Sequence, residues 1–210
     1  TPPNHAIAIV GWDDNKDTQA PLDGAWLCKN SWGTGWGYLG YFWISYYDRW
    51  ACKHPEMGAL SFRDVEPLAY DHAYIHDNHG WRDTWSSGTA AVNAFVATNS
   101  YLLNGASFYT TEDNVSYTVT VYDGFETGQL QDPLSSATGH YDHLGFHTVD
   151  LSPELRFRPG DDFYIELQVT GGGFAYDSTS VVPVLLSGEE DGATVVSASA
   201  PGESYYFDSA

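Results

Sequence analysis

From residue 68 onward, the chain consists of short segments in which apolar and polar residues alternate, separated by turn-forming residues. This period of two places apolar side chains on one face of an extended strand. Asp-Gly at 123–124, Pro-Gly at 159–160 and Gly-Gly-Gly at 171–173 predict turns between the segments. The expected strands cover about 70–76, 90–97, 100–109, 116–122, 145–150, 162–169 and 181–186. Antiparallel strands at this spacing predict a β-sandwich with jelly-roll-like connections.

The first 65 residues have a different pattern. His5 directly precedes an apolar run at 6–10, which predicts a buried strand with the imidazole at its start. A second strand is expected at 25–29, and it ends at Asn30. A connector at 63–67 follows, so we expect two domains, residues 1–65 and residues 66–210.

The segment after the second strand, Lys-Asn-Ser-Trp-Gly at 29–33, continues to Trp36-Gly37 and Gly40-Tyr41-Phe42. Together with His5, this run resembles the papain-like cysteine peptidases, whose active site is a Cys-His-Asn triad. In such a triad an imidazole holds the nucleophilic thiolate and protonates the leaving amine, and an amide oxygen orients the imidazole. The resemblance implies that His5 is the general base and acid, that Asn30 orients it, and that Trp32 shields their hydrogen bond from water.

The nucleophile of that triad is not among these residues. Cys28 and Cys52 both follow His5, whereas the family's nucleophile precedes its His by more than a hundred residues. We therefore expect Cys28 to be non-catalytic and the chain alone to be inactive. The simplest expectation is that this is the C-terminal fragment of a longer peptidase, whose upstream half is its partner. A disulfide between Cys28 and Cys52 is left open.

The second region has a resemblance of its own. Segments at 70–71, 80–81, 90–95, 108–111, 117–122 and 159–164 resemble the lectin-like domain that follows papain-like domains in bacterial and archaeal surface peptidases. The whole chain is thus expected to be mainly β: the C-terminal strands of a papain-like catalytic domain, then an antiparallel lectin-like β-sandwich. The resemblance also implies a secreted or cell-surface protein with a substrate-targeting module.

Carbohydrate binding requires aromatic rings beside polar groups, because the C–H faces of sugars stack on rings while hydroxyl groups form hydrogen bonds. The best such group in the sequence is Trp81, Arg82, Asp83 and Trp85. The favoured interpretation of Trp81 is nevertheless structural, with its ring packed between the sheets.

The formal net charge is −20, from 28 acidic and 8 basic residues. This excludes a nucleic-acid scaffold, which needs clustered Lys and Arg, and it disfavours anionic membranes. No apolar run approaches the ~20 residues of a membrane span.

No cofactor or metal ligand is assigned from the sequence. Zinc is disfavoured, because neither His group (His72, His76, His79 and His140, His143, His147) has Cys partners. Calcium is left open at the carboxylates of 13–17, at Asp161 and Asp162, and at Asp123 with Glu126.

These observations predict the C-terminal part of a secreted papain-like cysteine endopeptidase that cleaves peptide or protein substrates and carries a lectin-like targeting domain. The alternative is a non-catalytic carbohydrate-binding or adhesion module that retains a peptidase remnant. A Gln and Cys pair upstream of Thr1 would distinguish the enzyme from the binding module.

Overall fold

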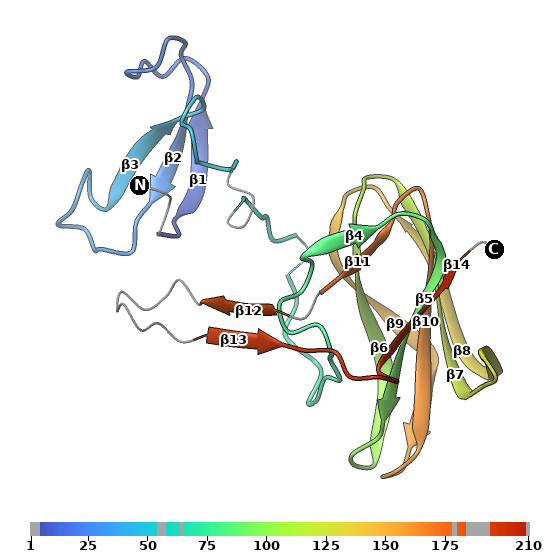
Figure 1. Cartoon of the computed structure of the whole chain (residues 1–210). Helices are drawn as coiled ribbons and strands as arrows, with labels where there is room; N and C mark the ends of the chain where they lie inside the picture. Colours follow the sequence, from blue (N-terminus) through green and yellow to red (C-terminus); the bar gives the residue numbers. More distant parts are fainter. Residues whose placement is uncertain (1–4, 54–57, 64, 178–179, 184–193, 209–210) are drawn as a thin grey trace. The chain divides into compact units, whose positions relative to one another are not determined.

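The computed structural model describes residues 5–53, 58–63, 65–177, 180–183 and 194–208. The chain forms two compact units, Thr1–Ala69 and Tyr70–Ala210 (Figure 1). The division is close to the predicted domain boundary between Val65 and Glu66. No helix occurs among the described residues, so none of them forms a helix long and apolar enough to cross a membrane.

The N-terminal unit contains one antiparallel sheet with the order β1-β2-β3. Its strands are β1 (Ala8–Asp13), β2 (Ala25–Lys29) and β3 (Tyr41–Ser45). β2 lies in the centre, which explains why Ala25 and Cys28 are its buried apolar residues. The first strand begins at Ala8 rather than at the expected residue 6, and it has a register shift between Ile9 and Gly11. Residues 6 and 7, which directly follow His5, therefore lie outside the sheet.

The C-terminal unit contains a five-stranded sheet in the order β14-β5-β10-β7-β8 and a four-stranded sheet in the order β4-β11-β6-β9. The strand pairings described within these two sheets are all antiparallel. The strands of the first sheet are β5 (Gly88–Val96), β7 (Val115–Glu126), β8 (Gln129–Tyr141), β10 (Asp162–Thr170) and β14 (Ser204–Asp208). Those of the second sheet are β4 (Asp83–Trp85), β6 (Tyr101–Thr110), β9 (Gly145–Phe157) and β11 (Phe174–Tyr176). A separate pair consists of β12 (Ser180–Pro183) and β13 (Thr194–Ser197).

An apolar core lies between these two sheets. Phe108 and Leu151 come from the four-stranded sheet, and Val119, Val121 and Phe163 come from the five-stranded sheet. Val121 and Phe163 are at most 1% exposed. Side chains alternate across each strand, so the opposite face of the five-stranded sheet carries Tyr122, Tyr164 and other residues that do not belong to this core.

Several predicted strands need correction. Residues 70–76 are not a strand. Tyr74 instead packs its ring onto Phe95 and Phe163 at centroid distances of 5.7 and 5.3 Å, so the alternation there reflects a packed loop. Residues 184–186 of the last predicted strand lie outside the described residues, and β12 covers the positions before them.

The predicted turn at Asp123 and Gly124 is wrong, because both residues lie within β7. The chain reverses at Thr127 and Gly128, whose φ angles of 50° and 80° are both positive. Two such residues suit a tight hairpin that matches the twist of its strands. The strand after this turn, β8, was not predicted, because its sequence is dominated by small and polar residues at the sheet edge.

Candidate active site

His5 and Asn30 meet at the start of the N-terminal unit. The His5 Nε2 atom lies 2.8 Å from the Asn30 Oδ1 atom. Since an amide oxygen can only accept, Nε2 carries the proton and donates it to this hydrogen bond. In the neutral ring the other nitrogen, Nδ1, is then an acceptor, which is the state in which an imidazole can take a proton from a thiol.

Asn30 is held firmly enough to orient this ring. It directly follows the central strand β2 and is 7% exposed. Its backbone N–H donates to Gly40 O at 3.0 Å, and its Oδ1 accepts a second hydrogen bond from the Ser31 N–H at 2.8 Å. Gly40 has a φ of 90°, and a Cβ there would lie 3.1 Å from Gly33 O. A glycine is therefore required where this loop closes onto Asn30.

The indole of Trp32 lies beside the imidazole. Its ring centroid is 5.2 Å from that of His5, at an angle of 34°. Trp32 packs edge-on against Trp36, which packs edge-on against Phe42 of β3. Trp32 is nevertheless 60% exposed, so it covers one side of His5 while most of its own surface faces solvent.

Cys28 has none of the properties of a nucleophile. It is 1% exposed, and its Sγ lies 3.7 Å from Trp26 O. Burial, with a smaller contribution from nearby Cys52, raises the pKa of Cys28 to about 11. Reactive cysteines have a lowered pKa. Cys28 and Cys52 are both free, so the disulfide that the sequence left open is not formed here.

The four residues predicted to bind carbohydrate are largely engaged in contacts within the C-terminal unit. Trp81 donates its Nε1–H to Thr84 Oγ1 at 2.9 Å, and Asp83 accepts from the Tyr176 hydroxyl at 3.0 Å. Trp85 packs on Tyr206 at a centroid distance of 4.7 Å, and its ring covers Gly88 so closely that a Cβ there would lie 1.8 Å from it. Arg82 is exposed. Both indoles are half-buried, which leaves limited ring surface for stacking.

The histidines considered for zinc are distributed among aromatic contacts. His72 stacks on Tyr101 at 4.9 Å, and His147 stacks on Tyr141 at 3.6 Å. Among the described residues, no three or more His, Cys, Asp or Glu side chains gather in a way that could hold a metal ion. Of the calcium candidates, Asp13 and Asp161 accept hydrogen bonds from nearby backbone N–H groups, those of Asn15 and Arg158.

The structure also contains a hollow that the sequence did not indicate. It has a volume of about 420 Å³ and is lined in part by Tyr164, Tyr205 and Glu203. These residues come from β10, from β14 and from the turn before β14, so no local motif could have joined them.

Comparison with known proteins agrees with this division. The family model described as a lectin-like domain matches residues 73–210. The chain belongs to the lectin-like domain family. Residues 1–60 match the model of the papain family of cysteine proteases, so a papain-like peptidase unit precedes the lectin-like unit.

Two solved structures share this arrangement. The cysteine protease and lectin-like domains of Cwp84, described as a surface layer associated protein of Clostridium difficile, align with a TM-score of 0.65 and 25% identity over 97% of this chain and 46% of that one. A clostridial Cwp84 chain after propeptide cleavage aligns with a TM-score of 0.64 and 24% identity, covering 97% and 51%. The latter shares the fold.

A curated relative supports the peptidase unit alone. Dipeptidyl aminopeptidase 1 of Plasmodium falciparum is 46% identical over 39 residues, which are 19% of this chain and 5% of that protein. The chain therefore spans about half the length of the solved neighbours and a small part of this relative.

Proposed function

We propose that this chain is the C-terminal part of a papain-like cysteine endopeptidase and supplies the His and Asn of its catalytic triad. The observation that carries the proposal is the 2.8 Å hydrogen bond between His5 and Asn30 within a unit that matches the papain family. The Cys nucleophile would come from the upstream half of the peptidase unit, which is not part of this sequence.

In the proposed reaction, the Nδ1 atom of His5 faces the Cys and takes its proton, which leaves a thiolate–imidazolium pair. The thiolate attacks the peptide carbonyl, and His5 then gives the proton to the leaving amine. In the second half of the reaction, His5 takes a proton from the water that hydrolyses the acyl-enzyme. Asn30 keeps the ring in the required tautomer, because its Oδ1 accepts from Nε2 throughout.

The test is a peptide-cleavage assay on the longer protein that includes the upstream half. We expect activity that a thiol-directed inhibitor abolishes, and no activity from residues 1–210 alone. The matched control is Cys28→Ser, which should retain the activity of the longer protein because this thiol is buried. Cleavage by residues 1–210 alone, together with inhibitor attached to Cys28, would overturn the proposal.

The lectin-like unit is proposed to target the enzyme to carbohydrate on a cell surface. Its match to the lectin-like model over residues 73–210 supports this role. A secreted or cell-surface location is part of the same proposal, and calcium is left as an optional ligand. The competing function is a non-catalytic binding or adhesion module with a peptidase remnant. It is favoured if the longer protein has no Cys that reacts with peptidase inhibitors.

A further inference from the structure

A hollow of about 420 Å³ lies within the lectin-like unit, at one end of the five-stranded sheet. Tyr164 and Asp162 of β10 and Tyr205 of β14 line it on the sheet side. The loop at 74–76 and the turn at 200–203 line its other sides. This volume is within the range of small-molecule sites in proteins.

Two tyrosine rings are held in place at this hollow. Phe125 packs against both, at centroid distances of 5.7 Å from Tyr164 and 4.5 Å from Tyr205. Both tyrosines are half-buried, so each keeps some ring surface that is not covered by the protein. Burial, the carboxylate of Asp162 and the nearby Tyr205 all raise the pKa of Tyr164. Asp162 and Tyr164 are two residues apart in β10, so their side chains lie on the same face of the sheet.

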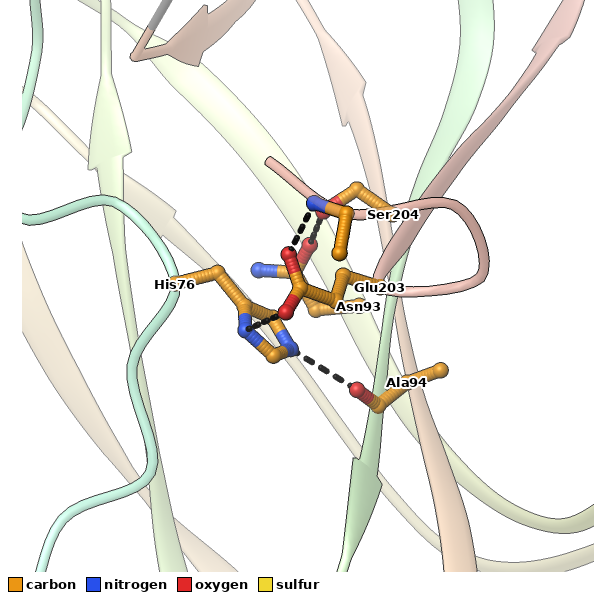
Figure 2. Close-up of polar contacts among 6 residues, drawn as sticks. His76, Asn93, Ala94, Glu203 and Ser204 are labelled. Atoms are coloured by element: carbon orange, nitrogen blue, oxygen red, sulfur yellow. Dashed lines mark hydrogen bonds and ion pairs between the residues drawn. The ribbon is translucent and has the colours of Figure 1, made fainter. Parts of the chain in front are cut away.

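A hydrogen-bond network fixes the opposite wall (Figure 2). The His76 ring stacks on Phe95 at 4.5 Å, and its Nε2–H donates to Ala94 O at 2.8 Å. Its Nδ1 lies 3.9 Å from Glu203 Oε1, while the other oxygen of Glu203 accepts from the Ala200 N–H at 2.6 Å. The backbone of Glu203 also accepts from Ala94 N–H, at 2.8 Å. A wall built in this way does not need to be ordered when a ligand binds, which favours affinity.

The charge of the lining restricts the class of ligand. Asp162 and Glu203 contribute carboxylates, and none of the described residues that line the hollow is Lys or Arg. An anionic ligand would be repelled by the carboxylate of Asp162, because the basic side chain in the described lining, His76, lies beside Glu203 instead, with its Nδ1 3.9 Å from Glu203 Oε1. Carboxylates are strong acceptors for hydroxyl groups, and tyrosine rings stack on the C–H faces of sugar rings. The lining therefore suits an uncharged molecule that presents both hydroxyl groups and C–H faces.

We propose that this hollow binds a neutral saccharide, which stacks on Tyr164 and Tyr205 and donates hydroxyl hydrogen bonds to Asp162. This inference rests on the proposed carbohydrate-targeting function and assigns that function a site and a ligand class. It also moves the binding site away from the cluster that contains Trp81 and Trp85, whose rings pack against their own unit.

The experiment is saturation-transfer NMR and titration of the 210-residue chain with methyl glycosides of glucose, galactose, mannose and N-acetylglucosamine, and with glucuronate. At least one neutral glycoside should bind, and glucuronate should bind at least about 10-fold more weakly than it. Tyr164→Ala and Asp162→Asn should each weaken binding about 10-fold, which is the usual size of a stacking or charged hydrogen-bond contribution. Asp162 is exposed, so its variant retains the fold even if Tyr164→Ala does not.

Two matched controls separate the site from the unit as a whole. Tyr206→Ala changes the neighbouring residue of β14, which is 69% exposed and does not line the hollow. Asp150→Asn removes an exposed carboxylate from β9 of the other sheet. Both should bind as the unchanged chain does.

Each contrary result has a distinct meaning. Binding that Tyr164→Ala and Asp162→Asn leave unchanged would overturn the site but keep the carbohydrate-targeting function. Tighter binding of glucuronate than of the neutral glycosides would overturn the ligand class. Failure of every glycoside to bind would overturn this proposal, and failure on a broad glycan array as well would overturn the targeting function.

Discussion

The two units differ in how completely they bury their apolar residues. In the peptidase unit, Ile9, Val10 and Trp12 of β1 are 41%, 51% and 68% exposed. In the lectin-like unit, Val121 and Phe163 are at most 1% exposed and belong to a core shared by two sheets. Yet the peptidase unit holds the ordered His5–Asn30 pair. The comparison shows that local loop contacts can hold the hydrogen bond between His5 and Asn30 in a unit that leaves apolar side chains of β1 exposed.

The largest effect is expected when the two units are produced as separate proteins. Residues 70–210 should fold cooperatively, because their core lies within them. Residues 1–69 should aggregate or remain unfolded, because exposed apolar strands of this extent associate with other surfaces. Thermal unfolding and the dispersion of proton NMR spectra measure both. A monomeric, well-dispersed spectrum from residues 1–69 would show that the apolar faces need no partner.

The next largest effect is expected at the proposed catalytic pair, His5 and Asn30, in the longer protein. His5→Ala should lower kcat/KM by about 10⁴-fold, because both proton transfers are lost. Asn30→Ala should cost less, on the order of 10²-fold, because the base remains but loses its orientation. Steady-state kinetics on a fluorogenic peptide measure both. Wild-type turnover by the His5 variant would remove His5 from the mechanism.

A substitution in the core of the lectin-like unit should lower stability more than a substitution of an exposed residue in the peptidase unit. Phe163→Ala should lower the free energy of unfolding of the lectin-like unit by about 3–5 kcal/mol, because it leaves a cavity in a closed core. Trp12→Ala, which removes an exposed ring of the peptidase unit, should change that free energy by less than about 0.5 kcal/mol. Urea denaturation of the whole chain gives both values. Equal losses would mean that the units unfold as one.

Burial within the peptidase unit can be tested at Cys28. With a pKa of about 11 instead of the ordinary 9.0, this thiol should react with iodoacetamide at pH 8 about 100-fold more slowly when folded than in urea. The folded state holds this proton more tightly than the unfolded chain does. Stability should therefore fall as the pH rises from 9.0 to about 11. Alkylation followed by mass spectrometry measures the rate, and fast modification of the folded chain would show that β2 is accessible.

The smallest effect is expected at Trp32. Trp32→Ala in the longer peptidase should lower kcat/KM about 10-fold, because water then reaches the bond between His5 and Asn30. Trp32→Phe should recover most of the loss, since a ring still covers the imidazole. An unchanged rate for the Ala variant would mean that this exposed indole contributes only to loop packing.

The contact between His5 and Asn30 was predictable because the motif that indicates it is short and local. Asn30 and Trp32 lie in one short motif, and a single strand pairing brings that motif to His5. The β-sandwich was also predictable, because apolar and polar residues alternate within most of its individual strands. In contrast, β8 was missed because polar and small residues at a sheet edge show little alternation. Residues 70–76 were wrongly predicted as a strand, because an aromatic side chain of this loop, that of Tyr74, packs against Phe95 and Phe163 as a side chain of a strand would.

The hollow lined by Tyr164 and Tyr205 could not be predicted from the sequence for a different reason. Tyr164 and Tyr205 become neighbours only because β14 and β10 both pair with β5. The sequence of β14 gave no sign that it would join this sheet. Likewise, the sequence around Trp81 and Trp85 is typical of a binding surface, but Tyr109 packs on Trp81 and Tyr206 packs on Trp85.

The place of β14 also bears on how the protein is made. Its Ser204 hydroxyl bonds to Asn93 of β5, a residue 111 positions earlier in the sequence. During synthesis, β5 emerges from the ribosome long before the strand that covers its edge. Until residues 204–208 appear, that edge presents unpaired N–H and C=O groups that other chains could join. The lectin-like unit can therefore close this edge of its sheet only after residues 204–208 have been synthesised, and until then the edge needs protection against aggregation.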